Sequence, residues 1–324
     1  MNNRILVDCF SWGRLLFIVR IIMVLGGGLT LGGCTIPEAS QRVALVYGVA
    51  DYPPLNDANP DDNDLSAPTN DAANMAALFT RQGYTVTQRT DSNVTKAAIL
   101  SDIKNLQGFS GLVVLYFSGH GTATSEGKAA IVPYDALQVS GQSVTLQEQN
   151  LITAADLKAA FDGAGITHRV LILDSCYSGG FVDAGATTDG IPPVYGYLDD
   201  GTSRYGFFLG ALGDAITAYV SYESSDSTVV LAAAGMGEYS WESETSGGSP
   251  TGVFTYYLLR GASYGDADGD SYLTTTELYA YTASRIAADW NAYYQSYPAD
   301  STQYADFHPH VSGNAREYLL FKKE

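Results

Sequence analysis

The sequence predicts a three-layer α/β/α sandwich around a mostly parallel sheet. Unbroken runs of aliphatic and aromatic residues at 112–117, 170–173 and 228–234 are typical of strands that are covered on both faces. Segments with helical apolar faces alternate with these runs, and no internal repeat is visible. Such sheets place their chemistry just beyond the carboxyl ends of the strands, so polar residues at those points are the first candidates for a functional site.

The other elements follow from capping residues, periodicity and breakers. Strands are expected at residues 42–50, 84–88, 112–117, 129–133 (a short edge segment), 170–173, 228–234 and 317–321. Helices are expected at residues 73–79, 95–106, 156–161, 207–219, 252–259 and 275–290. Asn70 or Asp71 is expected to cap the first helix, and Thr153 the third. Residues 181–205 form a long Gly-, Asp- and Thr-rich loop, of a kind that is functional or mobile.

Composition limits the classes of function. The 324 residues carry a formal net charge of -18, with a pI near 4.4. This charge repels phosphate backbones, which argues against nucleic-acid binding, and it suits cationic substrates or divalent metals. No linker divides residues 42–324, so one domain is expected there.

The N-terminal segment has the parts of an export signal: a basic flank, a short apolar stretch and small residues before a processing point. Its end, Leu31-Gly-Gly-Cys34, resembles the lipobox of bacterial lipoproteins. That resemblance implies a signal peptide at residues 1–33, lipidation of Cys34, a tether at 34–41 and a location at the bacterial cell envelope or periplasmic side. The alternative is an uncleaved membrane anchor over residues 15–31. Cleavage removes three Arg and one Asp, which moves the net charge from -18 to -20.

Cysteine usage singles out one thiol. Of the three cysteines, Cys9 would be removed and Cys34 acylated, which leaves Cys176. An exported protein with one free thiol has no disulfide framework, so the thiol is better explained by use than by structure. The alternative is an inert buried thiol. The neighbouring Asp, Ser and Gly residues argue against apolar burial.

Cys176 and His120 form a candidate catalytic dyad. Cys176 follows the apolar run at 170–173, and His120 follows the run at 112–117, so each lies just past a buried strand. A thiolate can attack a peptide carbonyl while a nearby imidazole assists deprotonation or protonates the leaving amine. The alternative for His120 is a structural histidine in a turn.

The sequences around the dyad resemble those of a known family. Tyr116-Phe-Ser-Gly-His-Gly121 and Asp174-Ser-Cys-Tyr-Ser-Gly179, with His120 preceding Cys176 by 56 residues, resemble the bacterial, metacaspase-like branch of the caspase family. The resemblance implies a caspase-like fold and a cysteine endopeptidase that acts on proteins or peptides without an organic cofactor. It also implies an oxyanion hole made by the N–H groups of Gly121 and Cys176.

The resemblance extends to specificity. Metacaspases place one acid two residues before the cysteine and another in an Asn-Asp motif near the first helix, and Asp174 and Asp71 match those positions. Two carboxylates lining a pocket would favour Arg or Lys before the cleaved bond. Alternatively, Asp71 caps its helix and Asp174 closes its strand.

Residues 266–277 follow the spacing of an EF-hand calcium loop. The expected Ca²⁺ ligands are Asp266, Asp268, Asp270, the Tyr272 carbonyl, Thr274 and Glu277. Ser271 departs from the pattern, because glycine normally occupies that position to allow the sharp turn. The alternative is a solvated acidic loop.

We therefore expect an exported, lipid-anchored cysteine endopeptidase whose activity responds to Ca²⁺. One alternative is another thiol hydrolase or transpeptidase, such as a relative of legumains or sortases. Another is an inactive caspase-like module that binds protein partners through its acidic surface. Trp241 is expected to line a subsite or to pack, and Arg204 is a candidate self-processing site. The oligomeric state is not predicted.

Overall fold

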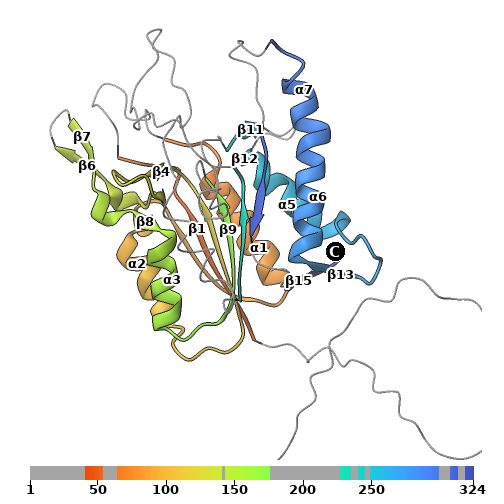
Figure 1. The fold of residues 1–324 in the computed structure, drawn as a ribbon, viewed down its shortest axis with the longest axis horizontal. Coiled ribbons are helices and arrows are strands. Elements are labelled where there is room, and N and C mark those ends of the chain that lie inside the picture. The colour runs from red at the N-terminus through yellow and green to blue at the C-terminus, as the bar shows by residue number, and fades with distance from the viewer. Residues whose placement is uncertain are drawn as a thin grey trace, which may run out of the picture. The chain divides into compact units, whose positions relative to one another are not determined.

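A six-stranded sheet with the order β14-β10-β9-β3-β1-β2 forms the centre of the fold (Figure 1). The structure is a computed structural model that describes residues 41–53, 64–140, 143–175, 227–234, 240–244, 249–298, 307–312 and 318–324. The strands are β1 (Arg42–Gly48), β2 (Thr85–Thr90), β3 (Leu112–Ser118), β9 (His168–Asp174), β10 (Ser227–Ala232) and β14 (His310–Ser312). Each neighbouring pair is parallel except β10–β14.

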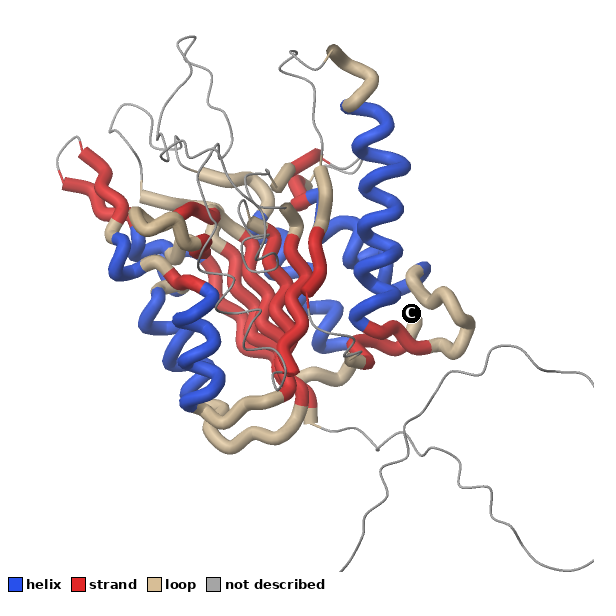
Figure 2. Tube along the Cα trace, in the orientation of Figure 1, coloured by secondary structure: helices blue, strands red, loops and turns tan. Residues whose placement is uncertain are grey.

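Helices cover both faces of this sheet, which confirms the α/β sandwich (Figures 1 and 2). One face carries α2 (Lys96–Lys104) and α3 (Ala154–Gly163). The other carries α1 (Pro68–Arg81), α5 (Val253–Tyr264) and α6 (Thr275–Arg285).

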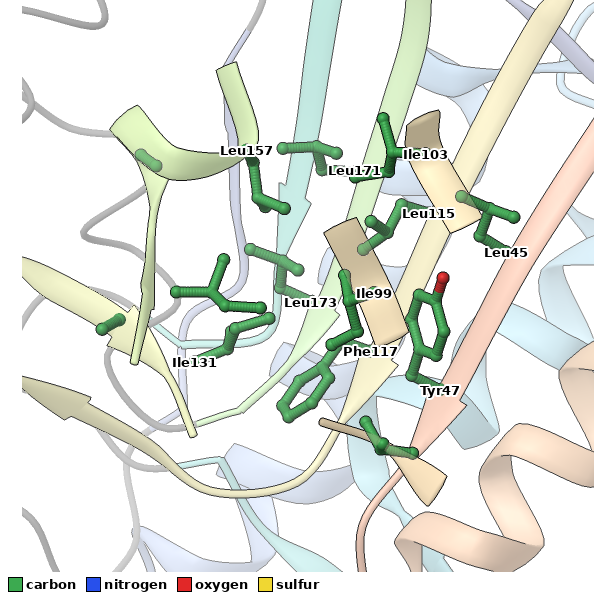
Figure 3. Packing of buried hydrophobic residues seen from close by; sticks show 14 of the residues in the cluster. Leu45, Tyr47, Ile99, Ile103, Leu115, Phe117, Ile131, Leu157, Leu171 and Leu173 are labelled. Carbon is green, nitrogen blue, oxygen red and sulfur yellow. The ribbon is translucent and has the colours of Figure 1, made fainter. Parts of the chain in front are cut away.

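Strand side chains alternate between two hydrophobic cores, one on each face. Leu45, Leu115 and Leu171 belong to the core beneath α2 and α3, where they pack together (Figure 3). Their neighbours Val46 and Tyr116 belong to the core beneath α1 and α5. Full burial of such a side chain contributes about 1.5–3 kcal/mol, so the unbroken apolar runs are explained by burial on both faces.

Smaller elements surround the sheet. They are the three-stranded sheet β4 (Gly121–Ala123), β5 (Ala129–Ile131) and β8 (Ile152–Thr153), and the pairs β6 (Leu137–Ser140) with β7 (Ser143–Leu146), β11 (Glu242–Glu244) with β12 (Pro250–Gly252), and β13 (Tyr272–Thr274) with β15 (Leu319–Lys322). Short 3-10 helices are η1 (Asp91–Asn93), η2 (Tyr134–Ala136) and η3 (Glu148–Asn150). Helix α6 continues as a π-helix, η5 (Ile286–Asn291), and as α7 (Ala292–Tyr294).

One local prediction is wrong about how a strand is paired. The segment at 129–133 is not an edge: its strand β5 lies between β4 and β8. The C-terminal strand β15 pairs with β13 outside the central sheet. Pairing partners depend on packing between distant segments, whereas strand propensity is local.

The predicted helix caps have mixed outcomes. Thr153 caps α3 through a full capping box with Asp156. Helix α1 begins at Pro68 instead, so Ala67 is its N-cap residue and neither Asn70 nor Asp71 caps it.

Several predictions concern segments outside the described residues. These are the leader and Cys34, the helix at 207–219 and the loop at 181–205. Across the ranges that the structure does describe, none of the helices has the length and apolar character that crossing a membrane requires.

Candidate active site

The carboxyl ends of β3 and β9 bring the two sequence motifs together. Ser118 pairs with Asp174 in the parallel register, and the N–H of Gly119 donates to the carbonyl of Asp174 at 3.2 Å. His120 and Cys176 each follow this pair by two residues. Ser175 is the last described residue of this segment, so Cys176 itself lies outside the described residues.

His120 is buried, with 6% of its surface exposed, and Tyr52 contacts it from the segment after β1. The two ring centroids lie 4.6 Å apart, with an interplanar angle of 43°. The backbone N–H of His120 donates to the Tyr52 hydroxyl at 3.0 Å. The sequence analysis missed Tyr52, because it lies 68 residues before His120 and follows a different strand.

Asp71 points from the first turn of α1 to the end of β12 and is fully buried. The N–H of Gly252 donates to both of its carboxylate oxygens, at 3.1 and 3.0 Å. The hydroxyl of Ser118 donates to its Oδ2 at 3.2 Å. Asp71 therefore joins α1, β3 and β12 in one network and does not cap its own helix.

Asp174 ends β9 and is 5% exposed. Its Oδ2 accepts hydrogen bonds from the N–H of Thr255 at 3.1 Å and from the Thr255 hydroxyl at 2.6 Å. Its Oδ1 accepts one from the hydroxyl of Ser240 at 2.5 Å. These bonds orient the carboxylate, because they reach it from both the loop after β10 and the start of α5.

The two carboxylates converge on Gly252. A Cβ atom at Gly252 would lie 2.3 Å from Oδ2 of Asp174 and 2.8 Å from Oδ2 of Asp71. The two oxygens are thus within about 5 Å of each other, a range in which like charges interact strongly. The sequence predicted both acids but not the glycine between them.

Burial and mutual repulsion change the acidity of both groups. Burial raises the pKa of Asp71 well above its usual range, and the nearby Asp174 raises it further. Burial also raises the pKa of Asp174, although its hydrogen bonds from Ser240 and Thr255 act in the opposite direction. Within the described ranges, no Lys, Arg or His forms a salt bridge with either carboxylate.

Glu242 adds a third carboxylate from strand β11. Its two oxygens accept hydrogen bonds from the backbone N–H groups of Ser66 at 2.9 Å and Ala67 at 3.0 Å, at the start of α1. It thus satisfies the backbone N–H groups of the N-cap residue Ala67 and of Ser66 before it. Burial raises the pKa of Glu242, and the charge of Asp174 adds to the effect. Sequence reasoning missed this residue because it is 175 positions from Ala67.

Three acids, of which Asp71 and Asp174 are buried and Glu242 is half-buried, give the site a negative potential when they are ionised. Asp71, Asp174 and Glu242 come from three different elements. The charges of Asp174 and Glu242 raise the pKa of Asp71, and the charge of Asp174 raises that of Glu242. A cation placed among them would stabilise their ionised forms, because charge pairing opposes the effect of burial. Such a site can select a positively charged group.

The acidic loop at residues 266–277 lies between α5 and α6, away from these acids in the sequence. Oxygen atoms of Asp266, Asp268 and Asp270 lie within 4.8 Å of one another. Ser271 has a φ of 72°, the left-handed conformation that glycine would supply at that position. The side chain of Glu277 accepts from the N–H of Ala267 at 3.1 Å.

The remaining expected ligands of this loop have other contacts. Thr274 and Glu277 form a capping box at the start of α6, and Tyr272 lies in β13, paired with Lys322. The Nζ of Lys323 approaches Oδ2 of Asp266 at 3.3 Å. Helix α5, the acidic loop and helix α6 follow one another in the order of an EF-hand. Strand β13, between the loop and α6, pairs with the C-terminal strand β15.

Other predicted residues have separate positions. Gly121 is the first residue of β4, directly after His120. Trp241 is half-buried beside Ser240 and Glu242, with its ring 6.4 Å from that of Trp290. Arg204 lies outside the described residues.

The similarity to one solved structure, a caspase-1, agrees with this fold. Caspase-1 from Spodoptera frugiperda is 14% identical, with a TM-score of 0.50, and the alignment covers 89% of this chain and 95% of that one. Protein GSU0716 from Geobacter sulfurreducens is 15% identical, with a TM-score of 0.48, over 87% and 97% of the two chains. A search of curated proteins found no match. At these identities the similarity concerns the fold alone.

A family model supplies the stronger result. The model of the caspase domain matches residues 41–303, which is most of the chain and includes both motifs. The chain therefore belongs to the caspase-domain family, whose members are cysteine peptidases.

Proposed function

We propose that this protein is a cysteine endopeptidase of the metacaspase type that cleaves peptide bonds after Arg or Lys. The observation that carries the proposal is the convergence of Asp71 and Asp174 on Gly252, next to the strand end that leads to Cys176. In this proposal, Cys176 is the nucleophile and His120 is the general acid and base.

The chemistry follows from these roles. The Cys176 thiolate attacks the scissile carbonyl, and the His120 imidazole protonates the leaving amine. The N–H groups of Gly121 and Cys176 would stabilise the negative charge on the carbonyl oxygen. In support, hydrogen-bonded and non-hydrogen-bonded residue pairs alternate along an antiparallel ladder such as that between β4 and β5. The N–H of Val132 donates to the carbonyl of His120, so His120 and Val132 form a hydrogen-bonded pair and the next pair, Gly121 and Ile131, does not. The N–H of Gly121 then points away from β5.

Burial makes the acidic pocket selective. A substrate guanidinium or ammonium group would pair with Asp71 and Asp174, which otherwise repel each other. Loss of one partner of a buried charged pair costs about 2–5 kcal/mol, so removal of either acid should weaken transition-state binding by more than tenfold. An acidic substrate side chain would meet two like charges.

A peptide-library digest tests the proposal. We expect the wild type to cleave after Arg and Lys, and Cys176→Ala to be inactive. Asp174→Asn should lower kcat/KM for Arg-ended peptides while the protein remains folded. Asp162→Asn is the control for loss of one carboxylate, because this half-exposed acid lies on α3, which covers the sheet face opposite to α1 and α5, and pairs with Lys158 and Arg169. Undiminished cleavage after Arg in Asp174→Asn would overturn the Arg/Lys specificity.

The alternative function is that of an inactive caspase-like module that binds partners through an acidic surface, as the net charge of -18 would allow. A peptidyl electrophile that carries Arg separates the two functions. Labelling at Cys176 that depends on His120 supports the peptidase. A thiol that never reacts in the folded protein supports the binding module.

Calcium regulation is a further part of the proposal. The clustered oxygens of Asp266, Asp268 and Asp270 and the left-handed Ser271 support Ca²⁺ binding at the 266–277 loop. Calorimetric titration should detect binding that Glu277→Ala weakens. Binding that is absent, or unchanged in this variant, would contradict the site. Peptidase assays with and without Ca²⁺ then decide whether binding alters activity.

The location of the protein is also proposed. The Leu31-Gly-Gly-Cys34 sequence supports export, with lipidation of Cys34 and attachment to a membrane through the lipid. Mass spectrometry of the N-terminal peptide from a bacterial host should find acylated Cys34 as the first residue. An intact segment before Cys34 would indicate the uncleaved anchor instead.

A further inference from the structure

The hydroxyl of Tyr52 interrupts the β4–β5 ladder beside His120. Gly121 lies opposite Ile131 in this antiparallel ladder, so His120 lies opposite Val132. The N–H of Val132 donates to the carbonyl of His120 at 3.0 Å. In a regular antiparallel ladder such a pair also makes the reciprocal bond, from His120 N–H to Val132 O.

The reciprocal bond passes through Tyr52 instead. The N–H of His120 donates to the Tyr52 hydroxyl at 3.0 Å, and this hydroxyl donates to the carbonyl of Val132 at 2.8 Å. One side-chain oxygen thus replaces a direct backbone bond and separates the two chains at His120. Because both backbone groups are buried, the hydroxyl also satisfies a donor and an acceptor that burial would otherwise penalise.

We infer that Tyr52 is a positioning residue for His120: its inserted hydroxyl fixes the backbone of His120, and its adjacent tilted ring limits the direction of the imidazole. This inference rests on the proposed peptidase function, in which His120 transfers the proton. A side chain that must reach both a thiol and a leaving amine needs a fixed orientation, and displacement by about 1 Å can lower the rate about a hundredfold.

Tyr52 is itself held rigidly. It is 1% exposed, and its N–H donates to Oδ1 of Asp64 at 2.8 Å. Oδ1 of Asp91 accepts hydrogen bonds from the N–H groups of Ala50 and Asp51 at 2.9 and 3.0 Å, which fixes the chain just before Tyr52. The segment after β1 is therefore a support anchored at several points, as positioning requires.

Gly119 makes room for this contact. A Cβ atom at Gly119 would lie 2.8 Å from the Tyr52 hydroxyl oxygen, so a side chain there would push the hydroxyl out of the ladder. The Tyr52 ring also lies 4.6 Å from the imidazole, which restricts rotation of His120. The glycine of the Ser-Gly-His motif thus has a role in admitting Tyr52.

Tyr52→Phe tests the role of the hydroxyl, because it keeps the ring. We expect kcat on an Arg-ended peptide to fall tenfold or more, with KM changed less than about twofold. A second readout needs no activity. The chain has four histidines, so the His120 imidazole signal in an NMR spectrum can be identified by its loss in His120→Ala. This signal should shift, and its titration midpoint should move, in Tyr52→Phe.

Tyr84→Phe is the matched control. Tyr84 is also buried, and its hydroxyl donates to the carbonyl of Leu320 at 2.8 Å. It directly precedes Thr85, the first residue of β2, and so lies at the amino end of that strand. This variant loses a comparable buried hydrogen bond, so a general loss of stability would affect both variants alike. We expect kcat and the His120 signal to remain as in the wild type in Tyr84→Phe.

Gly119→Ala provides a second route if Tyr52→Phe folds poorly. It should displace the hydroxyl while the tyrosine remains, and it adds backbone strain that does not depend on Tyr52, because φ of Gly119 is 156°. In the double variant Gly119→Ala/Tyr52→Phe, the loss of kcat should be smaller than the product of the two single losses, because both changes break one contact.

The outcomes separate this inference from the proposed function. Wild-type kcat and an unchanged His120 signal in Tyr52→Phe would overturn the positioning role, even if the wild type is an active peptidase. Fully multiplicative losses in the double variant would also overturn it. A wild type that cleaves nothing would refute the peptidase, whereas a shift of the His120 signal would still support the contact between Tyr52 and His120.

Discussion

Gly252 lies between the two carboxylates of the candidate pocket, where there is no space for a side chain. Its N–H donates to both oxygens of Asp71, and its Cα lies against Oδ2 of Asp174. Its φ of -58° is open to any residue, so the need for glycine here is steric and not conformational. Glycine is what allows two carboxylates to share one position.

Gly252→Ala should therefore damage the pocket with little backbone strain. The new methyl group would lie 2.3 Å from Oδ2 of Asp174 and 2.8 Å from Oδ2 of Asp71, so the carboxylates must move apart. We expect kcat/KM for Arg-ended peptides to fall about tenfold or more, since misplaced charge partners lose transition-state binding. Gly163→Ala is the control, because a Cβ there meets nothing within 4 Å. Equal kinetics in the two variants would contradict the steric argument.

The raised pKa of Asp71 predicts a pH-dependent stability. Between the unfolded pKa and the raised folded pKa, the folded protein retains a proton on this group that the unfolded chain has released. Its contribution to stability is present below the unfolded pKa of about 4 and is lost as the pH rises through the raised folded pKa. Asp71→Asn removes this loss and keeps an oxygen acceptor for the N–H of Gly252.

The variant should thus be more stable than the wild type at neutral pH, and the difference in Tm should shrink as the pH falls toward 4. Thermal unfolding between pH 4 and 8 measures this. Asp268→Asn, at an exposed position, controls for the change in net charge. If the wild type gains stability relative to Asp71→Asn as the pH rises, the predicted direction of the pH dependence is wrong.

At the scale of elements, an ion pair fastens the edge strand β2 to helix α2. Arg89 makes a two-point contact with Asp102, at 2.6 and 2.7 Å, and the Tyr47 hydroxyl donates to the same carboxylate at 3.1 Å. Asp102 is buried, whereas Arg89 is partly exposed. The pair therefore satisfies a carboxylate that could not be buried alone.

Arg89→Met should destabilise the fold by about 1–3 kcal/mol, because it leaves the Asp102 carboxylate buried with one donor. Urea unfolding measures the loss. The double variant Arg89→Met/Asp102→Asn should recover part of it, since the amide carries no charge and still accepts from Tyr47. A double variant that loses the sum of both single effects would exclude the ion pair as the cause.

At the scale of the whole molecule, the net charge of -18 acts on stability and on substrate binding in opposite ways. Raising the ionic strength from 0.01 to 0.1 M shortens the Debye length from about 30 to about 10 Å. Screening reduces self-repulsion in the folded protein, so Tm should rise. Screening also weakens attraction of a cationic substrate, so kcat/KM for an Arg-ended peptide should fall.

Measurements of Tm and kcat/KM over one salt series test these opposite trends. An Arg-ended peptide flanked by glutamates is the control, because screening should raise its kcat/KM. A fall of similar size for both peptides would mean that salt acts on the enzyme by another route.

The central strands were predictable because their signals are local, whereas Asp71 and Asp174 were proposed as site acids from the resemblance to metacaspases. The runs that became β3 and β9 are apolar on both faces, and burial between two helical layers requires this pattern. His120 follows the apolar run at 112–117 and Asp174 follows the run at 170–173, so both stand out in the sequence as polar residues at strand ends. Parallel pairing then places strand ends side by side, which is why two motifs far apart in sequence fall at one edge.

What the sequence alone determined was the α/β class, the strand ends that carry the motifs and the choice of candidate acids. Only the tertiary structure decided that Gly252 lies between Asp71 and Asp174, that Glu242 accepts from the N–H groups of Ser66 and Ala67 before α1, and that the Tyr52 hydroxyl accepts from the N–H of His120. Hydrophobic periodicity reports the surroundings of one segment. A hydrogen bond between segments far apart in the sequence depends on how the layers pack, and no local pattern encodes that packing.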